Sequence, residues 1–143
     1  MRVPAENLVY DDLYYLDGKP FTGVAYIMDD SGDWVQGEIE FKDGSESGVK
    51  REWWETGKLA YEGTLRGGRV HGKKRRWHYN GQLAEEGEYE YGIPVRERSW
   101  DEEGQLLEDY QLRETDPDYQ RIQRYRAQEQ EAIARDNLNN PET

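Results

Sequence analysis

The chain of 143 residues has the length of one domain, and its 35% charged and 34% hydrophobic residues leave room for only a modest core. Its 5 Trp and 11 Tyr nevertheless exclude a disordered chain, because aromatic side chains bury a large area and can stabilise a thin fold. The absence of cysteine excludes disulfides and thiolate metal sites, and the net charge of -12 argues against nucleic acid and anionic membranes as partners and favours a basic protein.

The N-terminal third, residues 1–47, is strongly acidic, with 11 acidic and 3 basic side chains. Its first residues have no apolar h-region, and no apolar run approaches the roughly 18 residues that cross a bilayer, so the sequence predicts a soluble, cytoplasmic protein. Residues 29–33 (Asp-Asp-Ser-Gly-Asp) resemble the start of a calcium loop, but no distal Glu completes the ligand spacing. We interpret this segment as a charged hairpin tip and expect no metal and no cofactor.

Four segments between residues 23 and 104 superimpose on one another, with closing glycines 25, 24 and 23 residues apart. An apolar residue stands four positions before each closing glycine, and another stands two positions after it. The columns are Gly32, Gly57, Gly81 and Gly104, preceded by Met28, Trp53, Trp77 and Trp100, and followed by Trp34, Leu59, Leu83 and Leu106. This register of three columns indicates a structural repeat.

Each repeat has the pattern of a β-hairpin. Pairs such as Asn80-Gly81 tolerate positive φ where the chain reverses, and Asn-Gly is the pair best suited to a type I′ turn. First strands are basic, as in residues 73–76, and second strands are acidic, as in residues 85–90, so neighbours attract each other. The sequence predicts a mainly β fold, a single antiparallel meander sheet of about four hairpins over residues 1–112, in units of about 18–44, 45–69, 70–93 and 94–112.

The last segment, residues 113–143, is predicted to be a helical extension. Asp116 and Pro117 are typical of a helix start, and the following residues are rich in Gln, Glu, Arg and Ala. The apolar side chains form an irregular stripe, which favours a helix packed on the sheet. A free amphipathic helix that docks only on a partner is the alternative.

The repeat resembles the MORN repeat variants, a group that includes YwqK-like antitoxins and bacterial immunity-type proteins. The resemblance rests on residues 77–83 (Trp-His-Tyr-Asn-Gly-Gln-Leu), on His71-Gly72, and on the opening segment 17–24, and it covers about residues 17–112. Met28 departs from it in the first unit and Val95 in the last. The resemblance implies MORN-like hairpin units, and it implies either an antitoxin-like or immunity-like protein or a scaffold.

The sequence shows no pattern of residues typical of an active site. Both histidines, His71 and His78, occupy repeat positions, and neither belongs to a nucleophile, phosphate-loop or zinc motif. The basic residues 73–76 could suggest nucleic-acid binding, but we expect residues 85–90 to neutralise them within the sheet. The sequence therefore predicts a protein that is not an enzyme.

Binding of another protein is the function we expect. An immunity or antitoxin-like protein would neutralise a cognate, basic toxin by direct binding, and acidic side chains would speed association. The alternative is a MORN-type scaffold for protein or membrane association. We expect a monomer or a weak oligomer formed through sheet edges. The candidate partner-binding residues are Asp11, Asp12, Tyr14, Asp29, Asp30, Asp33, Trp34, Glu38, Glu40 and Trp54.

Overall fold

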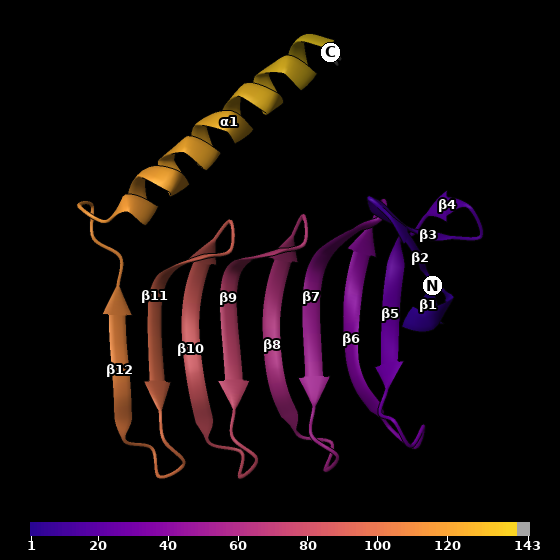
Figure 1. Cartoon of the computed structure of the whole chain (residues 1–143), viewed down its shortest axis with the longest axis vertical. Helices are drawn as coiled ribbons and strands as arrows, with labels where there is room; N and C mark the ends of the chain where they lie inside the picture. Colours follow the sequence, from indigo (N-terminus) through magenta and orange to yellow (C-terminus); the bar gives the residue numbers. More distant parts are fainter. Residues whose placement is uncertain (140–143) are drawn as a thin grey trace.

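The structure is a computed structural model that describes residues 1–139 and consists mainly of one sheet (Figure 1). Its nine strands lie in the order β1-β5-β6-β7-β8-β9-β10-β11-β12, so each hairpin pairs with the next. All neighbours are antiparallel except β1, which pairs in parallel with β5. The strands are β1 (Arg2–Pro4), β5 (Gly23–Met28), β6 (Val35–Lys42), β7 (Ser45–Trp53), β8 (Leu59–Arg66), β9 (Arg69–Trp77), β10 (Leu83–Glu90), β11 (Ile93–Trp100) and β12 (Leu106–Gln111).

The predicted meander of hairpins is confirmed, but it is not the only sheet. A small antiparallel sheet of β2 (Val9–Asp11), β3 (Leu13–Leu16) and β4 (Lys19–Pro20) follows a 3-10 turn, Ala5–Asn7. Two tight turns with positive φ at Asp12 (62°) and Asp17 (51°) make this sheet possible within few residues. It packs over the start of the large sheet, where the buried core cluster of Phe21, Ala25 and Phe41 lies.

The two ends of the strands carry different turns. At one end both central residues have positive φ, as at Asp43 (50°) and Gly44 (86°), which defines type I′ hairpins; the other such pairs are Gly67-Gly68 and Tyr91-Gly92. At the opposite end only the closing glycine has positive φ, and the Gly81 N–H donates to the His78 carbonyl at 2.9 Å. The type I′ turn predicted at Asn80-Gly81 is therefore wrong. A type I turn followed by a left-handed glycine replaces it, which also shifts the register of the strands there.

One face of the large sheet carries a row of charges that alternate in sign from strand to strand. Directly opposed residues form it, and the distances from Arg51 Nε to Glu62 and from Arg75 Nε to Glu86 are both 2.8 Å. We call this the charged row; it consists of Glu38, Arg51, Glu62, Arg75, Glu86, Arg98 and Asp109. The pairing of basic with acidic strands follows the sequence prediction. Each of these exposed pairs contributes roughly 0–1 kcal/mol, so the row fixes register more than it adds stability.

The other face is built from tyrosine rings and cations. The guanidinium of Arg76 lies 4.6 Å from the Tyr61 ring centroid, and Lys74 Nζ lies 4.7 Å from that of Tyr89. Glycines in the strands make room for these rings, because a Cβ on Gly87 would approach the Tyr89 ring to 2.9 Å. Tyrosines stacked over glycines thus take the place of an aliphatic core.

The C-terminal helix α1 (Pro117–Asn139) passes over the type I′ end of the strands (Figure 1). Ile122 is its buried residue, with 2% exposure, and Tyr125 packs on Tyr91 with 5.2 Å between ring centroids. Beyond the contact region the helix is open to solvent, with Ile133 46% and Leu138 81% exposed. The first half of α1 thus packs on the sheet, as expected for the helix. Residues 140–143 of the predicted extension lie outside the described residues.

Candidate protein-docking surface

The structure divides the acidic residues proposed from the sequence among three places. Asp11 and Asp12 belong to the small sheet, beside the type I′ turn between β6 and β7. The loop between β5 and β6, residues 29–34, carries the next three at the opposite end of the strands (Figure 1): Asp29, Asp30 and Asp33. Glu38 and Glu40 lie between these ends, on β6. The N-terminal third therefore does not present one continuous acidic surface.

Tyr14, proposed as an anchor, packs into the junction between the two sheets. Its ring lies 5.1 Å from that of Phe41 and 4.9 Å from that of Tyr10. Burial, with the nearby Glu46 carboxylate, raises the pKa of its hydroxyl. The Tyr14 N–H also donates to the Gly44 carbonyl at 2.9 Å, so this residue joins the small sheet to the large one.

The loop between β5 and β6 is organised by Asp29. Its carboxylate accepts hydrogen bonds from the Ser31 hydroxyl at 2.7 Å and from the Asp33 N–H at 3.2 Å. These bonds, that of Ser31 above all, lower the pKa of Asp29 and keep it charged. The Asp30 and Asp33 side chains remain exposed, which is the arrangement of a charged hairpin tip.

Three indoles line a recess of about 410 Å³ beside this loop. Trp34 comes from the β5–β6 loop, and Trp53 and Trp54 come from the end of β7, one hairpin further on. We call this the indole recess; its lining consists of Arg2, Trp34, Val35, Glu38, Trp53, Trp54, Glu55 and Gly57. It brings together Trp34, Glu38 and Trp54 of the predicted residues. Large half-buried aromatic rings beside carboxylates are typical of residues that dominate protein interfaces.

Trp54 is held by a contact with the loop between β9 and β10. Its ring meets that of Tyr79 edge-on at 5.6 Å between centroids, and the Tyr79 hydroxyl donates to Glu55 Oε1 at 3.0 Å. The buried indole N–H of Trp54 makes no hydrogen bond within the described residues. The ring is thus held in place by packing, which suits a rigid anchor for a partner.

Glu38 and Glu40 already have partners within the sheet. Glu38 lies 3.5 Å from Arg2 and 3.7 Å from Arg51, and Glu40 accepts the Val49 N–H at 2.9 Å. Two basic groups therefore offset the charge of Glu38 at the edge of the recess. Glu55 and Trp53 also line the recess but were not predicted from the sequence, although Trp53 belongs to the apolar column that precedes the closing glycines.

A second groove repeats this arrangement one hairpin along. It has a volume of about 870 Å³ and lies between the loops that follow β7 and β9. Trp77, Leu59 and Leu83 from the apolar columns line it, together with Lys58 and residues 80–82. The apolar columns therefore form a series of hollows along the loop end of the sheet.

The two histidines make structural hydrogen bonds. His71 Nδ1 accepts the Tyr91 N–H at 3.0 Å, and His78 Nε2 donates to the Trp100 carbonyl at 2.8 Å. Burial, aided by Arg66, lowers the pKa of His71, which keeps this acceptor free of a proton. Within residues 1–139, no three His, Asp or Glu side chains are grouped so as to hold a metal ion.

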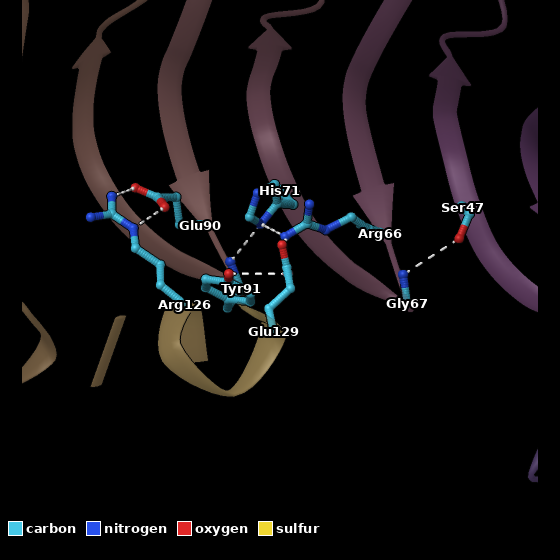
Figure 2. Close-up of polar contacts among 8 residues, drawn as sticks. All are labelled: Ser47, Arg66, Gly67, His71, Glu90, Tyr91, Arg126 and Glu129. Carbon is cyan, nitrogen blue, oxygen red and sulfur yellow. Dashed lines mark hydrogen bonds and ion pairs between the residues drawn. The ribbon is translucent and has the colours of Figure 1, made fainter. Parts of the chain in front are cut away.

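A polar cluster around His71 fastens α1 to the hairpin tips (Figure 2). Glu129 accepts from Arg66 at 2.7 Å and from the Tyr91 hydroxyl at 3.1 Å, and Arg126 donates to Glu90 through Nε and Nη2. Among residues 1–139, no helix combines the length and the hydropathy that crossing a membrane requires.

Comparison with known proteins supports the repeat. The family model described as MORN repeat variant matches residues 46–66 and 70–91. Two adjacent hairpins therefore resemble MORN repeat variants. They are the β7–β8 and β9–β10 hairpins, at the centre of the sheet (Figure 1). The finer resemblance to YwqK-like antitoxins remains a prediction.

Other comparisons are distant. The search of curated proteins finds no match. Two crystal structures, of TarM and of an S. aureus TarM mutant in complex with fondaparinux, alpha-GlcNAc-glycerol and UDP, resemble 73% and 75% of this chain with 14% identity and TM-scores of 0.40 and 0.42. The chain spans 19% and 20% of the length of those two chains.

Proposed function

We propose that this protein is a non-catalytic protein-binding module of the immunity or antitoxin type, which neutralises a cognate basic toxin by direct binding. The indole recess is the observation that carries the proposal. It combines Trp34, Trp53 and Trp54 from two consecutive hairpins, and the rigid loop with Asp30 and Asp33 adjoins it. A desolvated aromatic centre with a charged surround is the usual composition of a protein interface.

Charge supports a basic partner. The net charge of -12 attracts cationic surfaces over a distance of about 8–10 Å at physiological salt and raises the rate of encounter. Toxins that act on anionic substrates carry basic surfaces, and an acidic inhibitor with aromatic anchors can cover such a surface.

Co-expression with the product of the neighbouring open reading frame, followed by titration calorimetry, tests the proposal. Trp34→Ala is expected to weaken binding about thirtyfold, which corresponds to the ~2 kcal/mol of a residue central to an interface. Tyr10→Ala, at the far end of the strands and 65% exposed, is the matched control and should leave affinity within about twofold. Equal affinities for the two variants would reject the recess as the docking site.

Charge reversal provides the second arm. Asp30→Lys with Asp33→Lys is expected to slow association, whereas Glu131→Lys with Asp136→Lys makes the same change in net charge on the exposed half of α1. Asp29 is left intact because it holds the loop together. If both double variants slow association equally, the attraction depends on net charge alone, and the β5–β6 loop contributes no more than other acidic residues.

The MORN repeat variant match favours one alternative, a scaffold for protein or membrane association. Flotation with vesicles that contain anionic lipid separates the two proposals. An antitoxin-type protein with this charge is repelled and stays at the bottom of the gradient. If the protein floats with the vesicles, the scaffold function would replace the antitoxin-type proposal.

A further inference from the structure

The strand β12 is an open edge of the large sheet. Its neighbour on one side is β11, and within residues 1–139 no element lies on its other side (Figure 1). All six of its residues are exposed, including Leu106, Leu107 and Tyr110. The Leu112 N–H donates to the Val95 carbonyl of β11 at 2.8 Å, and alternate residues of an antiparallel strand face opposite ways. The N–H and C=O groups that point outward therefore belong to Asp109 and Gln111; the register shift between Glu108 and Leu106 interrupts the alternation at Leu107.

The charged row indicates what fits against this edge. Inside the sheet an acidic residue of the row stands between two basic ones, as Glu62 does between Arg51 and Arg75. Glu86 is flanked in the same way. Asp109 ends the row, and its two basic neighbours, Arg98 at 3.2 Å and Arg96 at 3.9 Å, both belong to β11. The next position in the pattern is that of a cation.

The surroundings of β12 are acidic as well. Residues 101–118 contain eight acidic side chains and one basic side chain, Arg113. Antiparallel pairing of two β12 edges would bring Glu108 and Asp109 of one copy against the same residues of the other, and like charges across a strand pair are unfavourable. The charge around the edge thus disfavours a second copy and favours a basic strand.

We propose that β12 binds an extended, basic segment of a partner protein by antiparallel strand addition. The incoming strand places Lys or Arg opposite Asp109 and pairs with the outward backbone groups of Asp109 and Gln111. The strand β11 already shows this composition, since its Arg98-Ser99-Trp100 segment lies beside an acidic strand. The inference rests on the proposed function only in taking the partner to be basic, and it concerns a surface other than the indole recess.

A peptide with the sequence of residues 93–100 (Ile-Pro-Val-Arg-Glu-Arg-Ser-Trp) tests the edge directly in the full chain, without the toxin. Fluorescence anisotropy should show saturable binding, and a peptide with Glu in place of both arginines should not bind. Amide chemical-shift changes should fall on β12. Absence of binding, or changes located elsewhere, would overturn the proposal while leaving the indole recess untouched.

Two edge variants and a control complete the test. Gln111→Pro removes an outward N–H without altering charge, and Leu107→Lys adds a repelling cation at a side chain that is 62% exposed. Each should weaken peptide binding about tenfold. The control Leu138→Lys makes the same Leu to Lys change on α1, far from the edge, and should have no effect. Thermal unfolding checks that the variants fold. If a variant does not fold, the amide chemical-shift changes that the peptide causes in the unaltered chain show whether it binds at β12. Equal binding by all variants, or a dimer of the chain that Gln111→Pro dissociates, would refute the basic-strand proposal.

Discussion

Replacing Ile122 by alanine is expected to release α1 from the sheet. Ile122 is the buried residue of the described helix, and two exposed ion pairs, Glu129 with Arg66 and Arg126 with Glu90, also join the helix to the hairpin tips. Truncating a buried Ile to Ala costs about 2–5 kcal/mol, less the few tenths that alanine gains in helix propensity. Exposed ion pairs contribute roughly 0–1 kcal/mol each, so Ile122 contributes more to docking than either ion pair.

Hydrogen exchange measured by mass spectrometry checks this expectation. In Ile122→Ala, peptides from residues 117–132 should exchange about thirtyfold faster or more, because a free helix of this length is marginal in water. Peptides from β7 to β10 should keep their protection. Ile133→Ala, the same substitution at a 46% exposed position of the helix, is the matched control. Unchanged protection of α1 in Ile122→Ala would show that the ion pairs, and not burial, hold the helix.

Three further predictions concern the sheet and its turns. Gly87→Ala should lower the free energy of unfolding in urea by about 1–3 kcal/mol, because its Cβ would lie 2.9 Å from both the Arg96 carbonyl oxygen and the Tyr89 ring. Arg75→Gln should cost less than about 1 kcal/mol in the same assay, since its pair with Glu86 is exposed. Because the pKa of His71 is lowered in the folded chain, the unfolded chain binds a proton at this histidine more readily. The contribution of neutral His71 to the free energy of unfolding is therefore complete above about pH 6.5 and declines as the pH falls through the folded pKa. His71→Asn, which retains an acceptor for the Tyr91 N–H, should therefore lose less stability than the unaltered chain between pH 7.5 and pH 5.5.

The repeat made the architecture predictable. Closing glycines at a nearly constant spacing mark one end of every hairpin, and the alternation of basic and acidic strands gave the neighbours, which the pair of Arg75 with Glu86 confirms. Turn geometry was harder to predict. Asn80-Gly81 is a favourable type I′ pair by residue type, yet its turn consists of the four residues from His78 to Gly81, and only the glycine has positive φ.

The small N-terminal sheet gave no usable sequence signal. Its strands are two to four residues long, and its turns depend on Asp12 and Asp17 at positive φ, which aspartate tolerates but does not require. Strands this short have no measurable period-two pattern. Their position is decided by contacts distant in sequence, such as that between Tyr14 and Phe41.

The candidate site was predictable in its residues but not in its grouping. Trp34 stands out as the aromatic member of a column otherwise filled by leucines, and Trp54 as the second of two adjacent tryptophans. That Trp34, Trp53 and Glu55 line one recess depends on the spacing of neighbouring hairpins. The acidic residues of the N-terminal third are close in sequence, but the tip of a hairpin and its two chain ends lie at opposite ends of the strands. Charge counted along a chain therefore does not locate charge on a surface.

Hydrogen exchange of the complex with the cognate partner tests the central claim most directly. Binding at the indole recess predicts that peptides covering residues 29–35 and 53–58 become protected, while the face of tyrosines and cations on β8 to β10 stays unchanged. Protection confined to α1, or to the type I′ turns beneath it, would contradict docking at the indole recess.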